Sequence, residues 1–241
     1  MKYYEDLIYA QIQLYFKELR WNIIYLILLN INKMSISESL NRKSKNFYYT
    51  TDITKLSHHP YNAGILPYQI GEDGNIYFLL GRDQQGYWAD FGGKCDSHKD
   101  RTKDGNNIKY TAARECYEET CGSLLGIDEL KSMLSNKNNY IVINSESMSG
   151  ISYYMFILKV PYRPNIITDR FNHTYNMLKY INASYQYTEK NEIKWFSIET
   201  LWEMLEGKNP LYKLKDVFRQ TLIKNKQELY ILQRLNKKKD Y

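Results

Sequence analysis

After residue 60, the chain alternates between short apolar runs and longer amphipathic segments. The runs predict strands at 63–70, 76–82, 88–91, 140–143, 151–160 and 192–196, with a hairpin turn at 71–75. Helical spacing is found between Asn106 or Asn107 and Gly122, at 168–181, at 198–205, and at Leu211, Leu214, Phe218 and Leu222. This alternation predicts an α/β sandwich built on a mixed sheet.

The first 55 residues differ in character from the rest of the chain. An apolar run at 19–31 is interrupted by asparagine and is shorter than the ~20 residues that cross a bilayer, so no membrane association is expected. We predict a short helical N-terminal arm and linker at 1–55, with a small basic cluster at Arg42, Lys43 and Lys45. A single domain would then occupy 56–241.

The most informative segment is a predicted helix that carries three glutamates. Glu115, Glu118 and Glu119 stand at i, i+3 and i+4, which places them on one helix face, downstream of a predicted glycine turn at Gly92-Gly93. Like charges this close repel, whereas Mg²⁺ or Mn²⁺ prefers oxygen ligands and often shares them with substrate phosphates. The pattern predicts metal-assisted chemistry on phosphate; the alternative interpretation is a solvated acidic helix face.

These residues resemble the signature of the Nudix hydrolases, G-x5-E-x7-R-E-U-x-E-E-x-G-U. Gly93 matches its glycine, and the pairs 114–115 and 118–119 match its Arg-Glu and Glu-Glu. Three positions depart from it. Seven residues are inserted between Gly93 and Arg114, Asn106 stands at the first glutamate, and one extra residue precedes Gly122.

The inserted segment at 95–105 is polar, charged and ends in glycine, which is typical of a solvated loop. Asp96, Asp100 or Asp104 could replace the missing glutamate, and His98 lies among them. We interpret all of them as solvated. The loop is then expected to bulge outward without affecting the site, since lengthening a surface loop costs under about 1 kcal/mol.

The resemblance implies a Nudix-like α/β/α sandwich and a set of functional residues. The implied ligands of Mg²⁺ or Mn²⁺ are the Gly92 carbonyl, Glu115, Glu118, Glu119 and Glu189, the last from the loop before Trp195. Catalysis would involve the three helix glutamates, with Arg114 orienting them, and either Glu115 or Glu189 as general base. Arg82 and Lys94 could bind phosphate or make ordinary surface salt bridges.

Composition bears on the ligand and on the compartment. A net charge of +6 favours anionic ligands, and 24 tyrosines together with abundant Asn, Lys and Ile indicate an AT-rich genome, such as that of a large DNA virus or a parasite. Three cysteines, an odd number, favour a reducing compartment. We expect a cytoplasmic protein, in the host cytoplasm if the genome is viral.

The implied reaction is metal-dependent hydrolysis of a phosphoanhydride in a nucleoside diphosphate linked to a moiety X. One alternative is mRNA cap hydrolysis, because viral decapping enzymes of this family also pair a helical segment with the Nudix domain, and RNA would then be a partner. An alternative of another class is a catalytically inactive Nudix-like module that binds a nucleotide or a protein.

Overall fold

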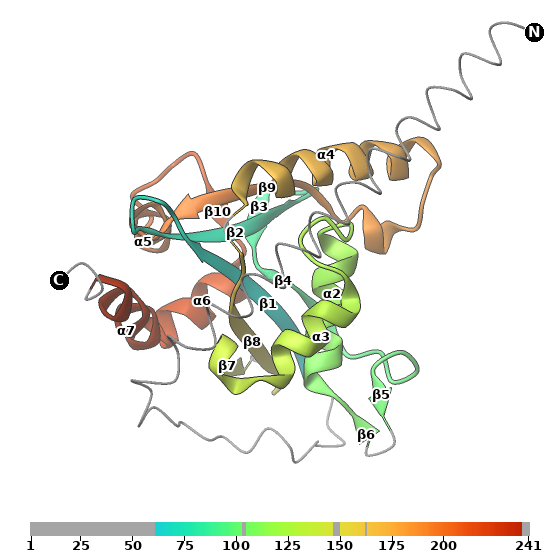
Figure 1. Ribbon diagram of the computed structural model, residues 1–241, viewed down its shortest axis with the longest axis horizontal. Helices are drawn as coiled ribbons and strands as arrows, with labels where there is room; N and C mark the ends of the chain where they lie inside the picture. Colours follow the sequence, from blue (N-terminus) through green and yellow to red (C-terminus); the bar gives the residue numbers. More distant parts are fainter. Residues whose placement is uncertain (1–60, 103–104, 147–149, 162, 238–241) are drawn as a thin grey trace, which may run out of the picture. The chain divides into compact units, whose positions relative to one another are not determined.

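The computed structural model describes residues 61–102, 105–146, 150–161 and 163–237. The predicted arm and linker at 1–55 and Asp104 of the insertion lie outside the described residues, so the division of the chain at residue 55 stays a prediction. Figure 1 shows most of the described strands gathered into one sheet with helices around it.

The elements have the following bounds. The strands are β1 (Tyr61–Ile70), β2 (Ile76–Asp83), β3 (Tyr87–Ala89), β4 (Phe91–Lys94), β5 (Arg101–Thr102), β6 (Gly105–Asn106), β7 (Tyr140–Glu146), β8 (Ser152–Lys159), β9 (Lys190–Ser197) and β10 (Lys213–Leu214). The helices are α2 (Ile108–Glu119), α3 (Ile127–Ser135), α4 (Pro164–Tyr180), α5 (Ile198–Leu205), α6 (Asp216–Lys224) and α7 (Lys226–Lys237), with 3-10 turns η1 (Lys137–Asn139) and η2 (Tyr185–Tyr187). None of these helices is long and apolar enough to cross a membrane.

Strand β1 lies inside the sheet. It pairs antiparallel with β2 through the predicted hairpin turn, parallel with β8, and antiparallel with the short β4. β8 pairs antiparallel with β7, and β2 pairs antiparallel with β9. Parallel and antiparallel pairings therefore coexist, as the prediction of a mixed sheet requires.

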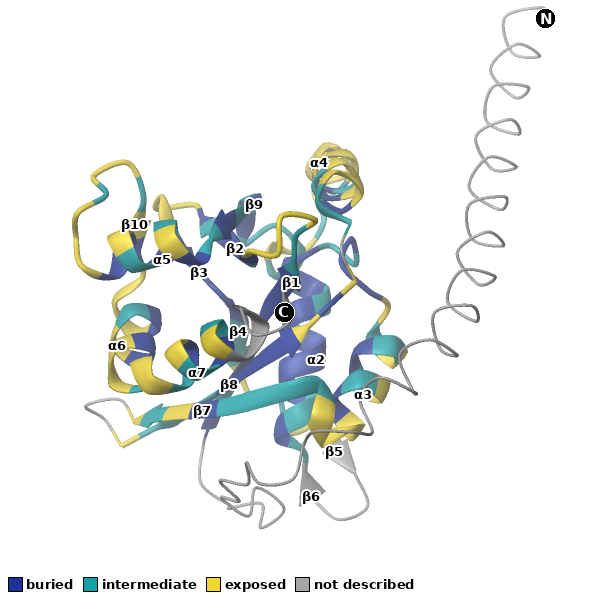
Figure 2. Cartoon of the chain, turned by 60° about the vertical axis from the view of Figure 1, so that its left-hand side comes forward, coloured by how far each residue is buried: buried dark blue, intermediate teal, exposed yellow. Residues whose placement is uncertain are grey.

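Helices cover both faces of the sheet and bury a separate core on each. Because successive residues of a strand point to opposite faces, β1 places Ala63 and Ile65 in one core and Leu66 and Tyr68 in the other. Helices α2, α3 and α4 close the first core, and α5, α6 and α7 close the second (Figure 2). The predicted α/β sandwich is confirmed.

Helix α2 carries the three glutamates, and its ends are set by local chemistry. Asn107, not Asn106, is the N-cap, and its side chain accepts a hydrogen bond of 3.0 Å from the Lys109 backbone. At the other end, the backbone N–H of Cys121 donates to the Glu118 carbonyl and that of Gly122 donates to the Tyr117 carbonyl. This is a Schellman motif with cysteine at the left-handed C′ position, where φ is 52°.

The left-handed cysteine leads to a stability prediction. Cys121→Gly should be more stable than Cys121→Ala by about 1 kcal/mol, because both variants lose the thiol but only glycine adopts positive φ without steric cost. Urea unfolding of the two variants measures the difference. Equal stabilities would show that the helix ends differently in solution.

The glycine pair differs from its predicted conformation. Gly92 and Gly93 lie in strand β4, paired with Gly64 and Ala63 of β1, rather than in a turn. Glycine is required at position 93 because it has no side chain. A Cβ on Gly93 would lie 2.6 Å from the carboxyl carbon of Glu115. The strand can therefore pass directly under the α2 carboxylates.

Two other predictions of secondary structure were wrong in detail. Leu211 is 80% exposed and Leu214 lies in β10, so the C-terminal helical region begins only at Asp216 and is divided into α6 and α7. Helix α4 begins at Pro164, four residues before the predicted start, because proline fits the first helical turn. The structure also adds α3, which the sequence pattern did not indicate.

Candidate active site

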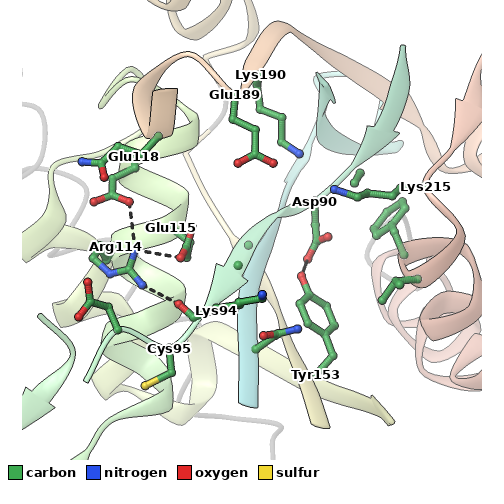
Figure 3. A pocket seen from close by; sticks show the side chains of 18 of the residues that line it. Asp90, Lys94, Cys95, Arg114, Glu115, Glu118, Tyr153, Glu189, Lys190 and Lys215 are labelled. Atoms are coloured by element: carbon green, nitrogen blue, oxygen red, sulfur yellow. Dashed lines mark hydrogen bonds and ion pairs between the residues drawn. The ribbon is translucent and has the colours of Figure 1, made fainter. Parts of the chain in front are cut away.

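A pocket of about 760 Å³ lies beside the C-terminal half of the α2 helix and strand β4 (Figure 3). Its lining comes from segments that are far apart in the sequence. The charged residues and tyrosines in this lining are Asp90, Lys94, Asp96, Lys99, Arg114, Glu115, Glu118, Tyr153, Tyr185, Glu189, Lys190 and Lys215. The pocket thus combines carboxylates with ammonium groups, a composition suited to a phosphorylated ligand and a cation.

Arg114 organises the carboxylates on the pocket wall. Its side chain is only 10% exposed and its Nη1 lies 2.8 Å from Glu115 Oε1 and 3.0 Å from Glu118 Oε2. Its Nη2 also donates to the Lys94 carbonyl at 2.9 Å, which ties α2 to β4. These contacts hold both glutamates next to the guanidinium, and the role of Arg114 as an orienting residue in catalysis stays a prediction.

Asp100 of the inserted loop corrects the prediction of a solvated insertion. It is 1% exposed, and its two carboxylate oxygens accept from Arg114 Nε and Nη2 at 2.8 and 2.9 Å. The same carboxylate accepts from the Thr111 hydroxyl and from the Asp96 backbone. Burial of a charge needs such a complete set of partners. Asp100 therefore holds the arginine that holds the glutamates.

The other acidic residue of the described insertion stays near the surface. The Asp96 carboxylate accepts from the backbone of His98 and Lys99, and it lies 3.9 Å from the Lys99 ammonium. It closes a local turn, and His98 is exposed. For these two residues the interpretation as a solvated segment agrees with the structure.

Glu119 is separated from its two helix neighbours. It is 2% exposed, and its Oε2 accepts from the Gly92 backbone at 2.8 Å. Its Oε1 lies 3.4 Å from the ammonium of the equally buried Lys190 and has no hydrogen bond of good geometry among the described residues. Glu119 thus lies behind the pocket wall formed by Glu115 and Glu118.

Burial gives two of these carboxyl groups an unusual affinity for protons. It raises the pKa of Glu115 to about 7, against the opposing effect of Arg114. It also raises the pKa of Glu119, and the neighbouring charge of Lys190 opposes this shift. A nearby cation would favour the ionised form of these buried carboxyl groups. A carboxylate with a pKa near neutrality can also accept a proton from water.

Sequence reasoning missed a second polar cluster in the pocket. Asp90 is 5% exposed and accepts a hydrogen bond from the Tyr153 hydroxyl, and burial raises its pKa to about 6. Both residues line the pocket (Figure 3). A signal was present: an aspartate directly follows the apolar run Trp88-Ala89, at a position where alternation predicts burial.

The remaining predicted site residues divide into two groups. Glu189 and Lys94 line the pocket with the α2 carboxylates, although their sequence positions are far apart. Arg82 instead makes a 2.9 Å ion pair with Glu192, both about two-fifths exposed, and it lies over the Trp88 ring. In this arrangement Arg82 makes the surface salt bridge that was the alternative to phosphate binding.

The donor set fits a hard divalent cation in its chemistry. The side chains are carboxylates, two with raised pKa values, and one buried oxygen of Glu119 has no well-aligned hydrogen bond. In the described part of the chain, however, no three His, Cys, Asp or Glu side chains are gathered closely enough to hold a metal ion. Arg114 Nη1 contacts both Glu115 and Glu118, so cation binding at these two carboxylates would require them to rearrange around the guanidinium.

Comparisons with known proteins give only distant likenesses. No family model matches the chain, and no curated protein matches it. A Nudix hydrolase from M. smegmatis is 13% identical over 72% of this chain and 88% of that chain, with a TM-score of 0.40. An Ap4A hydrolase from C. elegans is 16% identical over 70% and 98%, with a TM-score of 0.37. The C-terminal domain of mouse MUTYH, in complex with human PCNA, is 12% identical over 70% and 89%, with a TM-score of 0.41. Likenesses at this level assign neither a family nor an activity.

Proposed function

We propose that this chain is a Nudix-type pyrophosphohydrolase that cleaves a phosphoanhydride in a nucleoside diphosphate linked to a moiety X. The observation that supports it most is the buried unit in which Asp100 holds Arg114 and Arg114 holds Glu115 and Glu118 at the pocket wall. Such a unit positions carboxylates within a pocket, whereas a solvated acidic face would leave them free.

The residues of this chain have separate tasks in that reaction. Lys94 and Lys215, which both line the pocket, would bind the negative oxygens of the diphosphate. Glu115, with its pKa near 7, or Glu189 would accept the proton of the attacking water. Arg114 would keep Glu115 and its neighbours oriented rather than contact the substrate.

Mg²⁺ or Mn²⁺ fits as the cofactor. The candidate ligands are Glu115, Glu118, Glu119, Glu189 and the Gly92 carbonyl. A divalent cation held there would neutralise phosphate oxygens and lower the pKa of bound water.

Capped RNA is a second candidate substrate. Tyr185 lines the pocket and is 64% exposed, so a base could stack on its ring. Stacking would serve a small nucleotide equally well, and the basic cluster at Arg42, Lys43 and Lys45 lies outside the described residues.

An assay with Mg²⁺ or Mn²⁺ over nucleoside polyphosphates, sugar nucleotides, dinucleotides and cap-labelled RNA tests this proposal. We expect release of a nucleoside monophosphate or diphosphate from at least one class. If none is cleaved but a nucleotide binds, the chain is the inactive binding module, and the hydrolase proposal is wrong.

The raised pKa of Glu115 predicts how stability depends on pH without metal. Between pH 5 and 7, folded Glu115 retains a proton that the unfolded chain, with a pKa near 4.5, has released. The free energy of unfolding should therefore fall as the pH rises through this range, by about 2 kcal/mol or more. Saturating Mg²⁺ should largely abolish the fall, because a cation favours the ionised carboxylates.

Urea unfolding at pH 5.5 and pH 8, in EDTA and in Mg²⁺, measures this effect. Glu115→Gln should flatten the pH dependence in EDTA, since it removes the group with the raised pKa. A pH dependence that is identical with and without Mg²⁺ would contradict cation binding at Glu115.

A further inference from the structure

Lys190 is a buried lysine that the proposed reaction does not use. It is the first residue of β9, it is 2% exposed, and it nevertheless contributes to the pocket lining. Its stem passes over Gly81, where a Cβ would lie 2.9 Å from Lys190 Cγ and 3.0 Å from Cδ. The absence of a side chain at Gly81 therefore leaves room for the lysine stem.

The ammonium group lies among carboxylates. Lys190 Nζ is 3.4 Å from Glu119 Oε1, and Figure 3 shows the group reaching inward between Glu189 and Asp90. A charge buried to this extent requires a partner of opposite charge, and the Glu119 carboxylate is the group within ion-pair distance of Lys190 among the described residues.

Both oxygens of Glu119 already face groups of the protein. Oε2 accepts from the Gly92 backbone at 2.8 Å, and Oε1 faces the Lys190 ammonium. Glu115 and Glu118 differ, because their partners Arg114 and Lys99 leave both of them in the pocket lining. A divalent cation would have to displace a buried lysine to reach Glu119, and an unpaired buried ammonium is strongly destabilising.

We propose that the Lys190 ammonium is a built-in cation of this site, which neutralises Glu119 in place of a divalent ion. This inference rests on the proposed function and revises one of its ligands. Divalent ions would bind through Glu115, Glu118 and Glu189, and Glu119 would belong to the protein's own ion pair. The site then holds fewer divalent ions than its number of carboxylates suggests.

A titration of the full chain with Mn²⁺ tests the assignment without any substrate. Binding is measured by calorimetry and by the electron paramagnetic resonance signal of free Mn²⁺. Glu118→Gln should weaken Mn²⁺ binding at least tenfold. Glu119→Gln, an isosteric change in the same helix, should weaken it less than threefold. This comparison keeps Lys190 in place, so it does not depend on whether a lysine variant folds.

Removing the lysine gives the complementary result. Lys190→Met should bind one more Mn²⁺ than the native chain, and the added ion should be lost in the Lys190→Met, Glu119→Gln double variant. Lys190→Gln serves if the methionine variant does not fold, as judged by circular dichroism. The matched control is Lys215→Met, because Lys215 also lines the pocket but lies 4.0 Å from Asp83, so its loss should add no ion.

Each outcome decides between the proposals. If Glu119→Gln weakens Mn²⁺ binding as much as Glu118→Gln, or if a folded Lys190 variant gains no ion, the built-in cation is refuted while the hydrolase proposal survives. If neither the native chain nor a Lys190 variant binds Mn²⁺, the metal-dependent function itself fails, and the Lys190 assignment fails with it.

Discussion

Asp100→Asn should lower the free energy of unfolding by about 3 kcal/mol and reduce metal-dependent turnover at least tenfold. The variant leaves the buried Arg114 guanidinium opposite a neutral amide that cannot accept both of its N–H groups. Arg114 would then lose the carboxylate that holds its Nε and Nη2 groups. The side chains of Glu115 and Glu118, which Arg114 contacts, would become less well ordered. Urea unfolding and steady-state kinetics on the substrate found in the assay give the two values.

Asp96→Asn is the matched control for stability, since it changes an aspartate in the same loop to asparagine. Asparagine can still accept from the backbone of His98 and Lys99, and the ion pair that is lost is largely exposed. We expect a change within about 0.5 kcal/mol. If Asp100→Asn behaves like this control, the insertion is the dispensable loop that its composition suggests.

Glu118→Gln should reduce metal-dependent turnover by at least 10–100-fold while the fold remains intact. The carboxylate is 7% exposed in its side chain and contacts Arg114 at 3.0 Å, so an isosteric amide keeps the packing and removes the charge. Kinetics at saturating Mg²⁺, with circular dichroism as the check on folding, measure the effect.

Glu203→Gln, at an exposed position of α5, is the control for a general loss of negative charge and should retain the native rate. Native turnover in Glu118→Gln would remove this glutamate from the mechanism. A loss of turnover accompanied by unfolding would instead assign it a structural role with Arg114.

The site was predictable from the sequence where the signal is local. The spacing of Glu115, Glu118 and Glu119 depends only on helix periodicity, and the Asn107 cap and Gly122 mark the ends of that helix. Resemblance to a family pattern, and not spacing, indicates Glu189 as a metal ligand, and the structure places Glu189 in the pocket lining.

The insertion shows why composition alone does not identify the buried charges of a polar loop. Asp96 and Asp100 belong to the same run of charged residues, yet one side chain is about one-third exposed and the other is 1% exposed. The difference comes from Arg114, which lies 14 positions after Asp100 and meets it only when the loop folds back onto α2. Composition reports the average character of a segment and cannot say which of its charges finds a partner.

The sequence by itself determined the α/β architecture, the helix with its row of carboxylates and the glycine pair, because each follows from periodicity or from the backbone preferences of neighbouring residues. Only the tertiary structure decided the charge pairing: Asp100 with Arg114, Lys190 with Glu119, and Asp90 with Tyr153. These pairs join residues from segments that are far apart in the sequence, inside a low-dielectric interior. The partner that compensates a buried charge is set by how the elements pack, which no local pattern records.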